Sequence, residues 1–218
     1  MNIFFKSIKR FLGYILLSIL FIVSSIVAAT PDSLSPLLSL VRKNYNPETS
    51  LSTKFSLTIY WSVREKEEQK QGRIILAPGD RFRVTVSGET FVSNGETFWH
   101  CSAGANQVTI KQLATVDRAM LPSQIFARYI AAYSFRELER KKGMVLLAWK
   151  CDSGSTPYSA IRMEAKATSG RISRCVMTDR NNNTFTYVFT GTTFGKKYAR
   201  ETFDFTIPKD TRIVDLRN

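Results

Sequence analysis

The chain has 218 residues, with 31 Lys and Arg against 18 Asp and Glu, so its net charge at pH 7 is +13. This length suits one domain, and no linker, low-complexity tract or repeat divides it. One histidine and three cysteines at spacings that match no zinc pattern argue against a metal site, and the charge favours an anionic partner or serves solubility alone.

The N-terminal segment predicts export. Basic residues precede an apolar run over 11–27, which ends on small residues at Ala29. We therefore predict a signal peptide over 1–29 and a single exported domain over 30–218. The run approaches the ~18 residues of a membrane span, so an uncleaved anchor is the alternative. Cleavage would lower the net charge to 13 − 3 = +10, and export argues against nucleic acid as a partner.

The first elements of the domain are a helix and a strand. Leu34, Leu37 and Val41 recur at helical spacing, which predicts a short amphipathic helix over 33–44. Apolar and polar residues then alternate, which predicts a strand with one apolar side. That side consists of Phe55, Leu57, Ile59, Trp61 and Val63. The charged residues 64–70 predict a solvated hairpin.

The stretch 72–101 predicts short antiparallel strands joined by turns. Pro78-Gly79 and Asn94-Gly95 are turn dipeptides, and Asn-Gly in particular tolerates the positive backbone angles of a two-residue hairpin. Between these turns one strand places apolar residues on one side and polar residues on the other. Its apolar side consists of Phe82, Val84 and Val86. A further strand is expected near 107–111.

The hydrophobic period becomes helical after Leu121-Pro122. We predict a helix over 122–133 and expect 135–140 to continue it at an angle. One face of this helix consists of Ile125, Phe126, Tyr129 and Ile130.

Strands resume after the helical segment. The expected strands are 144–150, 160–167, 171–179 and 184–189. Phe203, Phe205 and Ile207 alternate with polar residues, which predicts a last long strand, and the tail 211–216 is expected to close the sheet edge.

About ten strands and two or three helices result, so the predicted fold is mainly β. A sheet of this size with one apolar face must curl, close or be covered, because an exposed apolar surface is unstable in water. An incomplete, half-open antiparallel barrel capped by the helices satisfies this requirement, and thin cover inside would leave a cavity for apolar ligands. A core filled by the same residues is the alternative.

Catalytic and redox chemistry find little support in the sequence. His100 is the one histidine, and no nucleophile elbow, phosphate loop or metal-binding cluster is present. We therefore predict no enzyme activity, no metal and no cofactor. Cys151 and Cys175 fall on strands expected to be neighbours, so they could form a disulfide in an oxidising compartment. Three buried thiols, with Cys101 as the third, are the alternative.

The segment Phe91-Val92-Ser93-Asn94-Gly95-Glu96-Thr97-Phe98-Trp99 is the most specific of several motifs in the chain. The others are Gly72-Arg73-Ile74-Ile75-Leu76 before Pro78-Gly79, Arg81-Phe82-Arg83, Leu121-Pro122, and Phe203-Asp204-Phe205-Thr206-Ile207-Pro208. In order and spacing, these motifs resemble the LolA family of periplasmic outer-membrane lipoprotein carriers. The resemblance spans nearly the whole exported chain.

This resemblance implies an unclosed barrel of eleven strands with a helical lid, whose apolar interior holds the acyl chains of triacylated lipoproteins in the periplasm. It also implies a donor, the inner-membrane ABC-type lipoprotein-releasing complex, and an acceptor, an outer-membrane lipoprotein receptor. We expect the chain to be a monomer. A carrier of glycolipid or another amphiphile, and a lipid-binding regulatory sensor, are the alternatives.

From these arguments we expect a lipid-binding cavity, a lid and a docking edge. The cavity residues are Phe55, Leu57, Ile59, Trp61, Phe82, Val84, Val86, Phe98 and Trp99. The lid residues are Ile125, Phe126, Tyr129 and Ile130, and the docking edge consists of Arg81, Phe82 and Arg83. The family places an arginine that holds the lid shut where this chain has Ala77, so Arg73, Arg81, Arg83 or packing alone would have to replace that latch.

Overall fold

The computed structural model of the chain describes residues 35–117, 121–122, 134–150 and 157–217. All of these belong to one compact unit, which spans Leu34–Asn218. Three groups of predictions lie outside the described residues. They are the signal peptide over 1–29, the lid residues Ile125, Phe126, Tyr129 and Ile130, and the position of Cys151.

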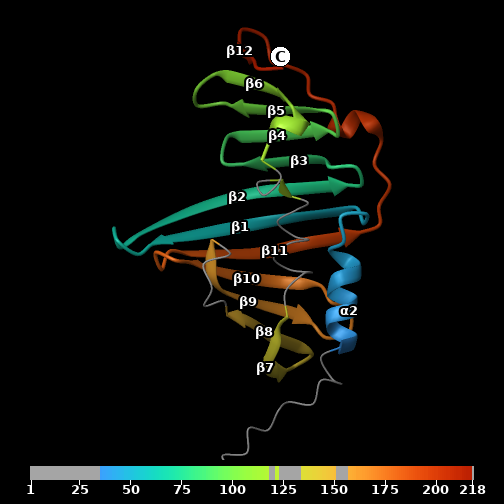
Figure 1. Cartoon of the computed structure of the whole chain (residues 1–218), viewed down its shortest axis with the longest axis vertical. Helices are drawn as coiled ribbons and strands as arrows, with labels where there is room; N and C mark the ends of the chain where they lie inside the picture. Colours follow the sequence, from blue (N-terminus) through green and yellow to red (C-terminus); the bar gives the residue numbers. More distant parts are fainter. Residues whose placement is uncertain (1–34, 118–120, 123–133, 151–156, 218) are drawn as a thin grey trace, which may run out of the picture. The chain divides into compact units, whose positions relative to one another are not determined.

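Twelve strands within the described residues form one sheet, in the order β12-β6-β5-β4-β3-β2-β1-β11-β10-β9-β8-β7 (Figure 1). They are β1 (Leu51–Trp61), β2 (Lys66–Ala77), β3 (Arg81–Val86), β4 (Glu89–Asn94), β5 (Thr97–Ser102), β6 (Gln107–Gln112), β7 (Arg136–Lys141), β8 (Met144–Lys150), β9 (Tyr158–Lys166), β10 (Ile172–Asp179), β11 (Thr184–Phe194) and β12 (Arg212–Asp215). Neighbouring strands are antiparallel except β12 and β6, which run parallel. With β12 and β7 at opposite ends the sheet is open, which confirms the predicted mainly β, half-open antiparallel architecture.

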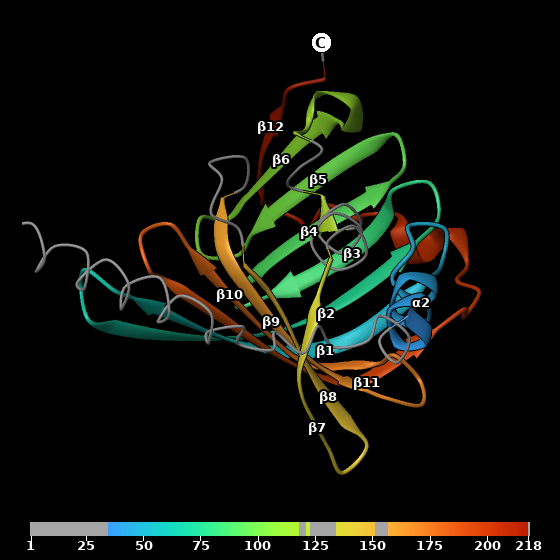
Figure 2. The same cartoon turned by 60° about the horizontal axis from the view of Figure 1, so that its bottom comes forward.

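Alternation along the strands gives this sheet one apolar face. Phe55 of β1 lies opposite Gly72 of β2 and Phe189 of β11, so all three strands contribute to that face. The sheet bends strongly, as Figure 2 shows. We call this side the apolar face and the other side the outer face. The buried residues that β8, β9 and β10 contribute to the apolar face are Val145, Leu147, Ile161, Met163, Ala165, Ile172, Cys175 and Met177.

The helix α2 (Ser35–Asn44) confirms the helix predicted over 33–44. Its residues Leu37 and Val41 are buried in the core of the apolar face. Just beyond it, the Tyr45 ring meets Phe194 of β11 edge-on at 5.3 Å between centroids, and its hydroxyl oxygen accepts a hydrogen bond from the Ile172 N–H at 3.0 Å. Burial raises the pKa of Tyr45, which keeps this hydroxyl protonated. The helix is therefore tied to the ends of β10 and β11.

Two short 3-10 helices, η1 (Leu113–Thr115) and η4 (Arg200–Phe203), complete the helical elements that the structure describes. In this described part of the chain, no helix has the length and apolar character needed to cross a membrane.

The charged segment 64–70 lies in the exposed β1–β2 hairpin, as predicted, but most of it is strand rather than turn. The turn is confined to 62–65, and β2 begins at Lys66. Pairing with β1 satisfies the backbone of this segment, with Lys66 opposite Trp61 and Lys70 opposite Leu57. The charged composition correctly predicted that these side chains are exposed. It did not predict that their backbone groups pair with β1.

Two predicted elements were wrong. Residues 135–140, expected to continue a helix, instead include most of the edge strand β7, because β8 offers them backbone partners. Residues 203–207, expected to end a long strand, belong to η4 and an irregular segment. That segment is anchored by side chains rather than by a strand ladder, since Phe203 is fully buried beside Ile75 and Ala77 on the outer face.

Candidate functional site

Eight of the nine residues predicted to line a cavity lie together on the apolar face. Register explains why, because odd-numbered residues of β1 and even-numbered residues of β3 and β5 point to the same side. Their roles in binding remain predictions, and their common placement is what the structure describes. The eight are Phe55, Leu57, Ile59, Trp61, Phe82, Val84, Val86 and Phe98.

Aromatic side chains of β11 and β4 extend this surface, and the sequence analysis did not assign them to it. Tyr187 and Phe189 stack in parallel at 5.9 Å, and the Tyr187 ring lies 5.9 Å from that of Phe55. The sequence predicted a strand over 184–189, but nothing in it revealed that β11 pairs with β1. Several of these rings are only partly buried, unlike Phe82, which is 1% exposed. They are Phe91, Phe98, Phe185, Tyr187 and Phe189.

Trp99 does not belong to this surface, so its predicted place in the cavity was wrong. Phe98 packs on the apolar face, and successive residues of a strand point to opposite sides. Trp99 therefore points to the outer face, where it pairs in register with Val92 and Ile110. Its ring centroid lies 6.4 Å from that of Phe205.

The predicted docking edge is also corrected. Phe82 is buried in the apolar core, whereas the side chains of Arg81 and Arg83 point to the outer face. There Arg83 donates hydrogen bonds to the carbonyl oxygens of Thr202 at 2.8 Å and Asp204 at 2.6 Å. These contacts hold the chain's own C-terminal segment, so the three residues do not present one exposed edge.

The same geometry places the family's latch position, and the three arginines named as candidate replacements, on the outer face. Ala77 is buried on the outer face beside Phe203, so a side chain at this position points away from the apolar face. Arg73, Arg81 and Arg83 lie on that outer face as well. None of them replaces a latch on the apolar side.

A polar corner borders the apolar face, formed by Lys70, Glu89, His100 and Ser102. The Ser102 hydroxyl donates to Glu89 Oε1 at 2.7 Å, and His100 Nε2 lies 2.6 Å from Glu89 Oε2. The hydrogen bond from Ser102, with smaller contributions from His100 and the Lys70 charge, lowers the pKa of Glu89. The His100 ring stacks on Phe91 at 4.5 Å between centroids.

This corner does not have the geometry of a serine nucleophile. An activated hydroxyl is hydrogen-bonded to its base, which a third group then orients. Here the carboxylate of Glu89 stands between the other two groups, and Ser102 donates to it rather than to His100. The corner can instead offer hydrogen bonds and charge to a ligand.

Cys175 is a free, buried thiol, which contradicts its predicted disulfide with Cys151. The two strands that led to this prediction are not neighbours, because β9 separates β8 from β10. Burial raises the pKa of Cys175 to about 12, so this thiol is protonated and unreactive at neutral pH.

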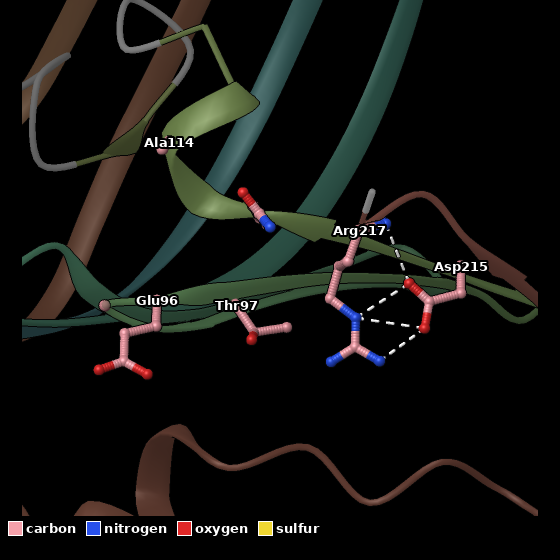
Figure 3. A pocket seen from close by; sticks show the side chains of 7 residues that line it. Glu96, Thr97, Ala114, Asp215 and Arg217 are labelled. Atoms are coloured by element: carbon pink, nitrogen blue, oxygen red, sulfur yellow. Dashed lines mark hydrogen bonds and ion pairs between the residues drawn. The ribbon is translucent and has the colours of Figure 1, made fainter.

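Two hollows lie at the margin of the sheet, one at the tip of a central hairpin and one at an edge strand. One of about 290 Å³, lined by Trp61, Val63, Arg64, Glu68, Asn181 and Asn183, opens beside the apolar face at the tip of the β1–β2 hairpin. The other, about 680 Å³, is a shallow groove at the β6 and β12 edge, lined by Glu96, Thr97, Ala114 and the ion pair of Asp215 with Arg217 (Figure 3). The first continues the aromatic surface through Trp61, whose ring meets Phe185 edge-on at 6.1 Å.

An open, bent β-sheet with one aromatic, partly accessible face is typical of proteins that bind apolar ligands. Residues 48–206 match the family described as outer membrane lipoprotein carrier protein LolA. The chain belongs to this family. Its members are carriers that bind lipid or lipoprotein.

Solved structures with a similar fold share little sequence with this chain. An uncharacterized conserved protein from Thermus thermophilus is 17% identical, with a TM-score of 0.49, and the match covers 84% of this chain and 99% of that one. A LolA superfamily protein from Nitrosomonas europaea is 10% identical, with a TM-score of 0.43 and coverage of 78% and 97%. LprF from Mycobacterium bovis is 10% identical, with a TM-score of 0.47 and coverage of 81% and 98%. Comparison with curated protein sequences gives no match.

Proposed function

We propose that this protein is a periplasmic carrier that shelters the acyl chains of lipoproteins and moves them from the inner membrane to an outer-membrane receptor. The observation that carries the proposal is the aromatic apolar face, on which Phe91, Phe98, Phe185 and Phe189 stay partly accessible. A large apolar surface that remains accessible in a monomer marks a site for a ligand or partner. Membership of the LolA family supports a lipid or lipoprotein as the ligand.

Release requires that the acyl chains be sheltered only in part. Burial of one methylene contributes about 0.8 kcal/mol, so complete burial of three long chains would exceed the strongest known non-covalent affinities, about 20 kcal/mol. An open sheet leaves each chain partly in contact with solvent. An acceptor that shelters the chains more fully then takes the cargo without an energy source. In this proposal the donor is an inner-membrane ABC-type releasing complex.

The proposal is tested with a charge placed on either face of the same strand. Phe189 of β11 lies on the apolar face, and its neighbour Val188 lies on the outer face with 40% exposure. Phe189→Glu is expected to reduce co-purified acylated material at least about tenfold, because a carboxylate inside an apolar site must be desolvated. Val188→Glu is the matched control and should leave co-purification unchanged.

Mass spectrometry of the material purified with the wild-type chain identifies the cargo. Triacylated protein supports the proposal. Free glycolipid or another amphiphile would make the chain a carrier of that class instead. A defined protein partner without lipid would favour a regulatory sensor, and equal loss in both variants would contradict binding on the apolar face.

A further inference from the structure

The polarity of the apolar face changes abruptly along β2. Ile74 and Gly72 continue the apolar surface opposite Thr53 and Phe55, but the next residue on this side is Lys70, opposite Leu57. On β1 and β11 the surface stays apolar to the hairpin tip, through Ile59, Trp61 and Phe185. The face is therefore divided into an apolar part and a polar corner.

The residues of the polar corner come from three strands that the sheet brings together. Lys70 lies on β2, Glu89 begins β4, and His100 and Ser102 lie on β5, in register opposite Phe91 and Glu89. The side chains of His100 and Glu89 are 36% and 35% exposed, so a ligand on this face can reach them. The stacked pair of His100 and Phe91 joins the corner directly to the aromatic surface.

Charge decides what kind of group the corner accepts. The ammonium of Lys70 and the carboxylate of Glu89 place opposite charges in the same corner. A phosphate would gain the attraction of Lys70 but meet the negative charge of Glu89. A neutral group with carbonyl oxygens gains hydrogen bonds from Lys70 without that repulsion.

We propose that Lys70, Glu89, His100 and Ser102 form a recognition site for the neutral, carbonyl-bearing head group of an acylated ligand whose chains lie on the adjoining aromatic surface. This inference rests on the proposed carrier function and names the part of the ligand that the corner holds. Lys70 donates to an ester or amide oxygen, and the His100–Phe91 stack supports the region where head group and chains join. Ester-linked glycerol supplies this chemistry both on an acylated cysteine and in free diacylglycerol.

The test measures displacement of the apolar fluorophore N-phenyl-naphthylamine by three ligands with palmitoyl chains: a triacylated cysteinyl peptide, a diacylglycerol and a phosphatidic acid. Lys70→Met is expected to weaken binding of the peptide and the diacylglycerol about fivefold, because one hydrogen bond is lost, and to leave binding of the fluorophore unchanged. Lys54→Met removes an exposed charge from the outer face of β1 and serves as the control. The peptide and diacylglycerol arms separate the two sources of the head group.

Glu89→Gln keeps the shape of the carboxylate and removes its charge. It is expected to raise the affinity for phosphatidic acid relative to diacylglycerol by on the order of fivefold, because the repulsion of phosphate disappears. Thermal unfolding of each variant checks that the sheet is intact. If the wild type binds neither acylated ligand nor fluorophore, the carrier proposal itself fails. If it binds them but all variants match the wild type, only the head-group site is overturned.

Discussion

Gly72 occupies a position at which no side chain fits. A Cβ atom placed there would lie 2.3 Å from the Thr85 carbonyl oxygen and 2.5 Å from Cζ of Phe55, both far inside van der Waals contact. The Phe55 ring lies across this glycine from the neighbouring strand. Glycine in a strand often marks such a close approach, and here it sets the position of a central aromatic residue of the binding face.

We therefore predict that Gly72→Ala destabilises the protein by about 2 kcal/mol, because Phe55 or the β3 backbone must move. Urea unfolding followed by tryptophan fluorescence measures the change. Gly104→Ala is the matched control, since a Cβ there meets nothing within 4 Å. Its effect should stay within about 0.5 kcal/mol. Equal effects at the two positions would show that the crowding around Gly72 relaxes without cost.

Residue-level prediction from the sequence succeeded where alternation alone decides the face. It placed Phe55, Phe82 and Phe98 on a common side, as the structure has them. It failed at Trp99, which was assigned to the cavity because it is aromatic. Trp99 follows Phe98 directly in the strand, and successive strand residues point to opposite faces. The polar corner was missed because Glu89 and His100 meet only through the pairing of β4 and β5.

At the scale of elements, the segment between β11 and β12 depends on a few side chains. Arg83 holds it through the carbonyl oxygens of Thr202 and Asp204, and the guanidinium of Arg81 lies 5.5 Å from the centre of the Phe203 ring. These contacts replace the ladder of a strand. The alternating apolar residues of 203–207 therefore belong to an irregular segment that packs on the outer face. Periodicity alone does not distinguish such a segment from a strand.

Replacing Arg83 by Met should loosen this segment selectively. Two hydrogen bonds from a charged donor are lost, so we expect a destabilisation of about 1–2 kcal/mol. Hydrogen exchange at the amides of Thr202 and Asp204 should become at least about fivefold faster, whereas amides of β8 and β9 should change less. Arg73→Met alters a neighbouring arginine on the same face and is the control. Unchanged exchange in the Arg83 variant would contradict the anchoring role.

At the scale of the molecule, the sequence predicted most strands and an open, curved sheet, but it did not predict how distant strands pair. Alternation and turn dipeptides identified most strands, and the need to cover one apolar face indicated an open, curved sheet. The pairing of β1 with β11 was not predictable, because strands from opposite ends of the domain sequence carry no local signal of their contact. That pairing is what gathers the aromatic residues into one surface.

An open sheet leaves two edges that could pair with another copy of the chain, and both show features that oppose such pairing. The β12 edge has only four residues. The β7 edge carries the sequence Arg-Glu-Leu-Glu-Arg-Lys, with a register shift between Glu137 and Glu139. Charge and a bulge both disfavour the regular ladder that a second strand would need.

The wild-type chain is accordingly expected to be a monomer, and replacing Glu139, Arg140 and Lys141 by Val should make it self-associate. The substitutions remove three charges from an unpaired strand and raise its β-propensity, so β7 becomes a template for a second copy. Light scattering coupled to size exclusion at tens of micromolar measures the mass. The control replaces Lys54, Arg162 and Arg174 by Val, which are exposed on the inner strands β1, β9 and β10. If both triple variants associate equally, added hydrophobicity is responsible, and the charged edge does not keep the sheet from growing.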